Sequence, residues 1–414
     1  MQATPGDIEF KTFTIGSLNL NDPNQAKKLE FNVYYDILNP LVAADIEILD
    51  ENDAMGTYNL KGDEDVNISF TVPGGEIISL KMVPFKNVNV NDNTLDNKGA
   101  MKHKTYTMKM VSPELNKNRN IHITNDFGGQ VPTHTMVQKA MKEISDKTID
   151  TPDQTKPQKQ YAHYETVFHF LEKIREHHVS QQYKSSAYVL YPTYDSGTEK
   201  YIFCTFEYLM SQESKFTFKQ DNTVGSRTTT DSDQMTNLIW CEIPSTFNSA
   251  TLAGSASNKN NYNLQTGVQQ GKDNQQSNMT TLGNKSQWDN QTNTADSVPK
   301  LKKPPTGTTG KVGVVDPGNE RQKTGIADAV ADRKRFLAYL SQNTIKFEIH
   351  GNPAIKIGDI VTLNLPKKAD AGQDDGEKQI NDKVLIVKIR HRILPEGNKP
   401  RYTMIIEAVK GAYK

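Results

Sequence analysis

The sequence predicts a mainly β protein that carries an α+β insertion. Apolar and polar residues alternate through the first 112 residues, and apolar residues recur at helical spacing within residues 113–212. Long alternating segments rich in β-branched residues return after residue 344. The 414 residues suffice for two to four domains, and the 35% that are hydrophobic can build their cores.

The N-terminal module is expected to contain six strands with one apolar face. The segments are rich in Val, Ile, Phe, Tyr and Thr, and turn residues such as Pro73-Gly74-Gly75 separate them. This pattern is typical of a barrel or a sandwich. The polar residues 87–103 are expected to form a loop before the last strand. The predicted strands are 7–16, 28–38, 44–50, 64–72, 76–83 and 104–111.

The middle of the chain is expected to form an α+β module. Helical spacing of apolar residues appears in 136–144 and again in 164–174. A β-hairpin follows, with Asp195-Ser196-Gly197 at its turn. Two helices on a small sheet bury both apolar faces.

A second β module is expected to begin with strands at 215–220 and 236–244. After these strands the amino-acid composition changes sharply. Between residues 251 and 300, 16 of 50 residues are Asn or Gln. Such a segment buries too little apolar surface to offset its chain entropy. We expect a long loop there. Trp288 would dock on a partner or pack on its own chain, whereas Trp240 is expected in the core.

Regular structure is expected to resume after residue 323. An apolar stripe predicts a helix over 324–342, with Asp332, Arg333 and Lys334 facing outward. Alternating strands follow at 345–350, 355–365, 383–393 and 401–410.

The segment HGNPAIKIGDIVTLNLP, residues 350–366, reads as a strand that ends, turns and begins again. Gly351 is expected to supply a positive φ, and Pro353 removes a backbone N–H donor. Gly358 and Asp359 form a second turn. These four residues are the structural turns that we single out as candidate site residues. A Gly-Asp pair also precedes an alternating strand in LKGDEDVNISF, residues 60–70, which favours two variants of one β unit.

No pattern indicates a catalytic, cofactor or metal site. Lys plus Arg and Asp plus Glu each total 49, so the charge balance does not indicate a strongly basic nucleic-acid binder. Cys204 and Cys241 are too few for a disulfide framework or a four-ligand zinc site, and we expect buried thiols. The sequence has no G-x-S-x-G, P-loop or G-x-G-x-x-G motif. No secretory signal opens it, and no apolar run approaches the ~20 residues that span a bilayer.

The histidines and the adjacent acids do not fit the spacing of a metal site or of a pair of catalytic carboxylates. The spacings of six and eight among His163, His169 and His177 do not fit H-E-x-x-H, so with His178 they are expected at the surface or in caps. His391, between two arginines, is expected on a charged strand face, the alternative being a phosphate or DNA contact in a channel. Glycoside hydrolysis needs two carboxylates across a groove. The adjacent acids are instead expected to be solvated: Asp63, Glu64, Asp65, Asp374 and Asp375.

The C-terminal succession ADRKRFLAYL, IKFEIHGNPAIKIGDIVTLNL, KVLIVKIRHRI and YTMIIEAVKGAY resembles the baseplate hub proteins of contractile-tailed, T-even-like bacteriophages. The order of the other modules is similar too. The resemblance implies two similar tube-type β-barrels plus a small helix/sheet domain and a long loop insertion. The implied domains are a first barrel (1–112), the α+β domain (113–212), the start of the second barrel (213–250), the insertion and linker (251–323), and a helix with the rest of the second barrel (324–414).

In that family three chains form a ring whose six barrels face the sixfold tail tube, while the other face receives a trimeric spike. The resemblance implies a structural homotrimer in the tail baseplate of the virion, assembled in the host cytoplasm, around a channel through which DNA leaves during genome ejection. Implied partners are a separate spike polypeptide, tail tube or tube-initiator proteins and other baseplate proteins, with no cofactor and no sequence-specific DNA contact. The alternatives are the spike hub of a bacterial contractile injection machine, a cell-wall hydrolase and a glycan-binding receptor module.

Overall fold

The computed structural model describes both β modules and the α+β module, and short parts of the segment between residues 220 and 343. The described residues are 7–22, 24–50, 54–58, 60–72, 75, 77–91, 104–124, 126–153, 157–183, 186–219, 238–242, 259–263, 269–272, 312–316, 333, 344–365, 380–395 and 401–409.

The first β unit contains six main strands, a two-residue strand β2 and a short helix α1. Alternation shapes each strand: in β4, Ala44, Ile46 and Ile48 enter the core while the residues between them stay half-buried. All six predicted strands are present, and the mainly β class is confirmed. The elements are β1 (Glu9–Ile15), β2 (Leu18–Asn19), β3 (Lys27–Asp36), β4 (Ala43–Asp50), α1 (Ala54–Thr57), β5 (Val66–Thr71), β6 (Ile77–Asn91) and β7 (Lys104–Val111).

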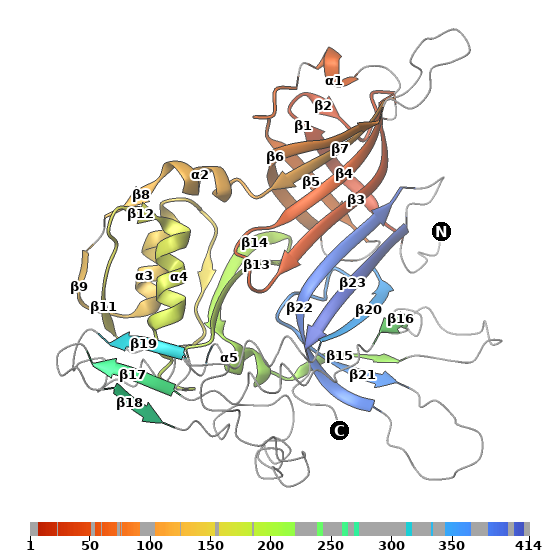
Figure 1. Cartoon of the computed structure of the whole chain (residues 1–414). Helices are drawn as coiled ribbons and strands as arrows, with labels where there is room; N and C mark the ends of the chain where they lie inside the picture. The colour runs from red at the N-terminus through yellow and green to blue at the C-terminus, as the bar shows by residue number, and fades with distance from the viewer. Residues whose placement is uncertain are drawn as a thin grey trace, which may run out of the picture.

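The second β unit is built from six strands at the positions that alternation predicted. Its two longest strands, β22 and β23, end the described chain and lie at the centre of the molecule (Figure 1). The strands are β15 (Ser214–Lys219), β16 (Leu238–Glu242), β20 (Thr344–His350), β21 (Ile360–Leu365), β22 (Ile380–Leu394) and β23 (Arg401–Val409).

The two units have the same topology. Across the sheet, the first unit has the order β1-β5-β6-β7-β4-β3 and the second has the order β15-β21-β22-β23-β20-β16. Strands that correspond in chain order therefore occupy corresponding places. The pairings agree throughout except at the first place, where β1 pairs with β5 antiparallel and β15 with β21 parallel. This repeat supports the prediction that the chain contains two variants of one β unit.

A single antiparallel pairing joins the units into one 13-stranded sheet. β3 pairs with β22 from Phe31 opposite Ile393 to Asp36 opposite Lys388. A bridge between Asp7 and Arg401 also links the start of the chain to β23, so β22 and β23 complete a closed path of strands with the first unit. In the second unit, no pairing among the described strands joins β15 to β16. The two units are thus parts of one continuous sheet, joined through β3 and β22.

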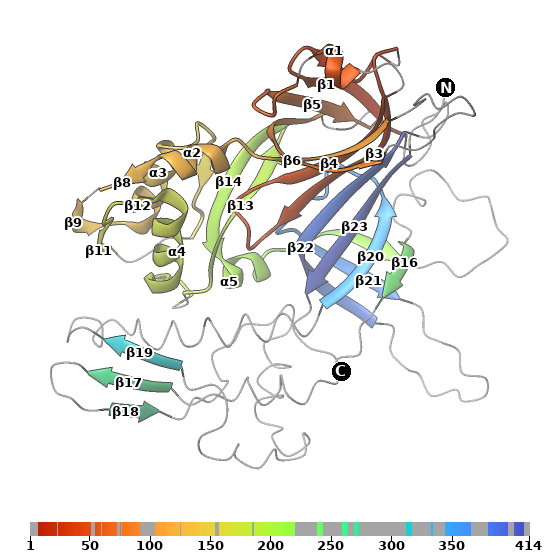
Figure 2. The ribbon, with the colours of Figure 1, turned by 45° about the horizontal axis from the view of Figure 1, so that its top comes forward.

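The α+β module lies beside the sheet, with helices α3 and α4 on the far side of the β13–β14 hairpin (Figures 1 and 2). Both predicted helices and the hairpin are present. The elements are α2 (Glu114–Asn120), β8 (His122–Ile123), β9 (Asp126–Val131), α3 (Thr133–Lys142), β10 (Ile149–Asp150), β11 (Gln158–Tyr161), β12 (Glu165–Thr166), α4 (Val167–His177), β13 (Tyr188–Asp195), β14 (Thr198–Thr205) and α5 (Phe206–Met210).

The β13–β14 hairpin is buried on both faces. Tyr188 and Phe203 belong to the apolar core beneath the helices, whereas Val189 and Tyr191 belong to the core of the large sheet. A strand buried on both faces cannot alternate between apolar and polar residues, which explains the run YVLYPTY. The hairpin therefore ties the module to both cores.

Three expectations for the connecting segments need correction. Strand β6 continues through Asn91, so the predicted loop at 87–103 begins too early. The segment expected to be a loop contains two short strands, which form a three-stranded sheet with a third strand from the expected linker. Strand pairing uses backbone groups, so a polar composition did not prevent it. The strands are β17 (Lys259–Asn263), β18 (Gln269–Lys272) and β19 (Val312–Asp316).

The helix expected over 324–342 lies outside the described residues except at Arg333. That residue is buried, with its guanidinium 3.8 Å from a carboxylate oxygen of Glu176 in α4, so the expectation that it faces outward is wrong. Trp288, Asp374 and Asp375 lie outside the described residues. Within the described part of the chain, no helix combines the length and the apolar character needed to cross a bilayer.

Candidate functional site

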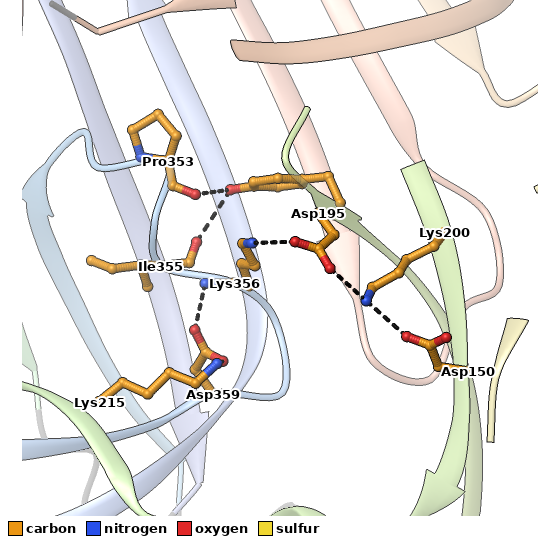
Figure 3. Close-up of polar contacts among 9 residues, drawn as sticks. Asp150, Asp195, Lys200, Lys215, Pro353, Ile355, Lys356 and Asp359 are labelled. Carbon is orange, nitrogen blue, oxygen red and sulfur yellow. Dashed lines mark hydrogen bonds and ion pairs between the residues drawn. The ribbon is translucent and has the colours of Figure 1, made fainter. Parts of the chain in front are cut away.

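The predicted corner, residues 351–359, lies where the second β unit meets the α+β hairpin. It connects β20 to β21 and contacts Tyr191 and Tyr194 of β13. In Figure 3, Lys356 of the corner points toward Asp195 of the hairpin. All four candidate turn residues are therefore brought together at the junction of two modules. We call this contact between residues 351–359 and the β13–β14 hairpin the joint, because it fixes the second β unit against the α+β module.

Gly351 is required at this corner because an aromatic ring lies against it. A Cβ atom there would lie 1.9 Å from a ring carbon of Tyr402, and the Gly351 N–H donates to the Tyr402 carbonyl over 2.9 Å. Its φ is not positive, so the expected left-handed conformation is wrong. Glycine is required because the Tyr402 ring lies close to the backbone at this position. The local sequence pattern does not reveal that contact.

Gly358 does adopt the left-handed conformation, with φ +85°. A Cβ atom there would also lie 2.4 Å from the Tyr191 hydroxyl. The buried Asp359 carboxylate accepts the Lys356 backbone N–H over 2.9 Å and a Lys215 ammonium hydrogen over 2.6 Å. Gly358 thus lies in a left-handed turn, and Asp359 closes that turn with a side-chain hydrogen bond.

The corresponding turn of the first β unit uses the same device. Gly62 has φ +98°, and the Glu64 carboxylate accepts the backbone N–H groups of Lys61 and Gly62, the latter over 2.8 Å. Burial of Glu64 acts to raise its pKa, but these hydrogen bonds outweigh burial and lower it. The expected solvated acid is thus a turn-capping group.

Pro353 contributes a carbonyl acceptor to the joint. The buried Tyr194 hydroxyl donates to the Pro353 carbonyl over 2.8 Å and lies 3.3 Å from the Ile355 carbonyl. The Lys356 ammonium lies 5.3 Å from the centre of the Tyr194 ring, a cation–π distance. One side chain of the hairpin therefore fixes the chain direction between the two turns.

We predict that Tyr194→Phe lowers the free energy of unfolding by about 1–2 kcal/mol, because it leaves the Pro353 carbonyl buried without this donor. Urea denaturation measures the loss, and hydrogen exchange should accelerate at the corner first. Tyr183→Phe removes an exposed hydrogen bond to Ser211 and serves as the control, with an expected change within about 0.5 kcal/mol. Equal losses in the two variants would contradict this role for Tyr194.

Ion pairs surround the outer edge of the joint. Lys200 bonds Asp150 over 2.7 Å and Asp195 over 3.0 Å, while Lys356 lies 4.0 Å from Asp195. The hydrogen bond to Asp150 raises the pKa of Lys200, and the bond from Lys200 lowers the pKa of Asp195. Asp195, Lys200 and Lys356 line a cleft of about 690 Å³. Its two aspartates, Asp195 and Asp359, each have a lysine partner, an arrangement suited to holding segments together.

A buried ion-pair group joins separate segments within the α+β module. The Lys147 ammonium lies 3.0 Å from carboxylate oxygens of Glu114 and Glu199, and all three side chains are largely buried. Burial opposes the charge on Lys147, but the two carboxylates outweigh it and raise its pKa. Removing one partner from such a group leaves a buried charge uncompensated. Lys147 thus holds α2 and β14 of the module together.

His391 is fully buried, so the expected exposed strand face and the alternative DNA contact are both wrong. Its Nδ1 lies 2.6 Å from the Tyr402 hydroxyl, and burial lowers its pKa to about 3. The alternation of β22 explains this: Ile389, His391 and Ile393 face the core, while Arg390 and Arg392 face out. His391 supports the ring that packs on Gly351.

The four histidines of the α+β module do not form a metal site. His178 is buried, with Nδ1 hydrogen-bonded to Thr133, whereas His177 bonds the Lys173 carbonyl over 2.7 Å and His169 lies 3.5 Å from Glu165. The ring of the fourth histidine, His163, stacks on the ring of Tyr161. Within the described residues, no three His, Cys, Asp or Glu side chains gather to hold a metal ion.

The cysteines and the described tryptophan differ in part from expectation. Cys204 is buried, and burial raises the pKa of its thiol, as expected for an inert core residue. Cys241 is only half-buried, with a thiol pKa raised by burial to about 11. Trp240 is half-buried outside the core, and its indole N–H donates to Glu348.

Sequence reasoning missed the tyrosines that hold the corner. Tyr191 and Tyr194 come from a segment 160 residues earlier in the chain, and Tyr402 comes from the last strand, so no local spacing joins them to Gly351. One feature of the sequence could have indicated these tyrosines. The tyrosine-rich segment of β13 does not alternate between apolar and polar residues, as expected for a strand that is buried on both faces.

Comparison with known proteins finds likeness in fold. No family model matches the sequence, and no curated protein matches it. Among solved structures, a tail protein from Neisseria meningitidis matches with TM-score 0.56 and 10% identity over 98% of this chain and 96% of its own. The prophage MuSo2 tail protein from Shewanella oneidensis matches with TM-score 0.56 and 11% identity over 98% of both chains. The chain therefore has, over nearly its whole length, the mainly β fold of these two tail proteins.

Proposed function

We propose that this chain is the central hub subunit of a phage tail baseplate. Three copies would form a ring that adapts the sixfold tail tube to a threefold spike and surrounds the channel through which DNA leaves. The observation that carries the proposal is the repeated β unit, in which six strands take the same places twice. Likeness of fold to two tail proteins over nearly the whole chain supports it.

The repeat supplies a physical reason for the trimer. Two similar units in one polypeptide, repeated by a threefold axis, produce six similar units in a ring. A sixfold partner then meets matching surfaces at every position, and differences between the units remain available for a threefold partner. The alternative, the spike hub of a bacterial contractile injection machine, requires the same adaptation of symmetry.

The proposed role is assembly and not catalysis. The paired aspartates and buried tyrosines of the joint serve to hold modules together, and a ring subunit transmits load through such joints. The proposed partners are a spike protein, tail tube or tube-initiator proteins and other baseplate proteins. DNA would pass without sequence-specific contacts, and the site of action would be the tail of the virion after assembly in the host cytoplasm.

Native mass spectrometry of the purified chain tests the proposal. We expect a species of three times the 46.4 kDa chain mass, and electron microscopy should show a ring with a central hole. A strict monomer at high protein concentration would contradict the hub function. Neighbouring genes separate the two hub interpretations, because only a virus also encodes a capsid and a terminase. Clearing of peptidoglycan by the isolated chain would argue for the hydrolase instead.

A further inference from the structure

One short stretch of the α+β module exposes two tyrosine rings to solvent. Tyr161 ends β11 and is 44% exposed, and Tyr164 directly precedes β12 and is 73% exposed. Strands β8, β9, β11 and β12 lie on the side of the module away from the large sheet (Figures 1 and 2). Both rings are therefore accessible to a partner from outside the molecule.

Tyr164 is exposed because its backbone adopts the left-handed conformation. Tyr161 and His163 are exposed and Ala162 between them is buried, as strand alternation requires. The next inward place would belong to Tyr164, but its φ is +49° and Glu165 is the buried residue instead. Bulky residues rarely adopt this conformation, because the side chain crowds the backbone. The chain thus accepts backbone strain and leaves a large ring in water, which packing of the core does not explain.

A histidine ring supports each of these tyrosine rings. The ring centres of Tyr164 and His122 lie 4.8 Å apart with 16° between the planes, and those of Tyr161 and His163 lie 6.1 Å apart with 24° between the planes. His122 belongs to β8, which pairs with β12, so two segments of the chain hold the first stack. Each histidine covers one face of its tyrosine, and the exposed fractions show that much of the remaining ring surface reaches solvent.

The chemistry of these side chains matches that of a sugar ring. The C–H bonds on one face of a sugar carry partial positive charge, and the face of an aromatic ring carries negative charge. Phenol hydroxyls and imidazole nitrogens both donate and accept hydrogen bonds, as sugar hydroxyls do. Two tyrosine rings three positions apart on one segment can therefore contact neighbouring sugars of one chain.

Other partners fit this stretch less well. A nucleic acid needs cations to meet its phosphates, and the ammonium group of Lys173 in α4 is already paired with Glu165. The core of a protein interface is mainly apolar. The large aliphatic side chains that are exposed in the described part of the chain belong instead to the β units: Leu29, Leu38, Ile77 and Ile239.

We propose that the stacked pairs Tyr164–His122 and Tyr161–His163 form a binding site for a neutral polysaccharide, with a sugar ring packed on each tyrosine. This function is additional to assembly, because the site lies within one chain and needs no second copy. In a ring of identical chains the site would be repeated, and simultaneous contacts with one polysaccharide would strengthen the binding.

Affinity electrophoresis of the full chain tests the proposal. Native gels that contain dextran, mannan, galactan or glycol chitin should include at least one that retards the native chain. In that gel, Tyr164→Ala and Tyr161→Ala should each raise the apparent dissociation constant roughly tenfold. Tyr164→Phe keeps the ring and should bind as the native chain does. Phe85→Ala removes an exposed ring of β6, 51% exposed, and is the matched control that should also leave binding unchanged.

Tyr164→Gly separates binding from folding. Glycine adopts a positive φ without strain, which offsets the loss of the stacked ring, so the urea midpoint should stay close to the native value. Retardation by the polysaccharide should nevertheless fall as in Tyr164→Ala. Native retardation in all the alanine and glycine variants would overturn the proposal, and so would a native chain that no gel retards. The mass of the assembled protein should be the same in every variant, so failure of this site would leave the hub function standing.

Discussion

Gly351→Ala is expected to lower the free energy of unfolding by about 3 kcal/mol, near the upper end of the usual range for overpacking. The added methyl would lie 1.9–2.3 Å from three atoms of the Tyr402 ring. That ring cannot move aside easily, because it is fully buried, touches Phe70 and is hydrogen-bonded to His391. The backbone of the corner would therefore have to shift, and with it the contacts of Pro353 with the hairpin.

Gly62→Ala supplies the matched control. Gly62 has φ +98°, but a Cβ atom there meets nothing within 4 Å. Only backbone strain remains, which costs about 1–2 kcal/mol. Urea denaturation should therefore rank Gly351→Ala as the more damaging variant. The opposite ranking would show that the conformation of the chain, and not the approach of Tyr402, requires glycine at the corner.

Alternation predicted the strands because most of them have one buried face. β4, β20 and β23 alternate almost perfectly, and their predicted positions agree with the structure to within two residues. Helical spacing identified α3 and α4 for the same reason. Both periodicities predict which residues of a segment face a core. Neither predicts which of the cores of the protein the segment packs against.

Contacts between distant segments could not be predicted in this way. His391 lies between two arginines in sequence, yet the alternation of β22 places it inside beside Tyr402. The two neighbouring arginines indicated an exposed strand face for His391. Adjacent residues of a strand point to opposite faces, however, so exposed arginines place His391 on the buried face. Gly351 shows the same limit, because the residue that requires it comes from another strand.

The repeat was visible in sequence only as a weak Gly-Asp echo. Its two copies differ at most positions, and a further register shift between Val88 and Val90, which β22 lacks, hides the correspondence. What the copies keep is the order of strands, a bulge at Pro84/Lys86 and at Ile386/Lys388, and the turn with an acid behind a left-handed glycine. Backbone geometry has therefore been retained while side chains were adapted to different neighbours.

Acidification is expected to destabilise the protein through two buried histidines. Burial lowers the pKa values of His391 and His178 to about 3, against 6.5 in an exposed chain. Between these values the unfolded chain binds a proton that the folded chain excludes, so stability is complete above pH 6.5 and falls as the pH decreases toward 3. From pH 7 to pH 5, each histidine should remove about 2 kcal/mol from the free energy of unfolding.

Buried carboxyl groups act in the opposite direction, so a variant must isolate the histidine contribution. Burial raises the pKa values of Asp153 and Glu199, which makes the folded state the better proton acceptor at low pH. His391→Gln keeps a hydrogen-bonding group beside Tyr402 but cannot titrate. Its unfolding free energy should therefore change less than that of the native chain between pH 7 and pH 5, by about 2 kcal/mol.

His169→Gln provides the comparison, because the His169 side chain is 64% exposed. This variant should keep the full pH dependence of the native chain. If both variants follow the native curve, His391 accepts a proton in the folded protein, and the barrel interior around Tyr402 must admit water. If only His391→Gln weakens the pH dependence of the unfolding free energy, the stability lost at low pH comes from protonation of His391. Because His391 supports Tyr402, and Tyr402 packs on Gly351, the joint of the two modules should then loosen as the protein is acidified.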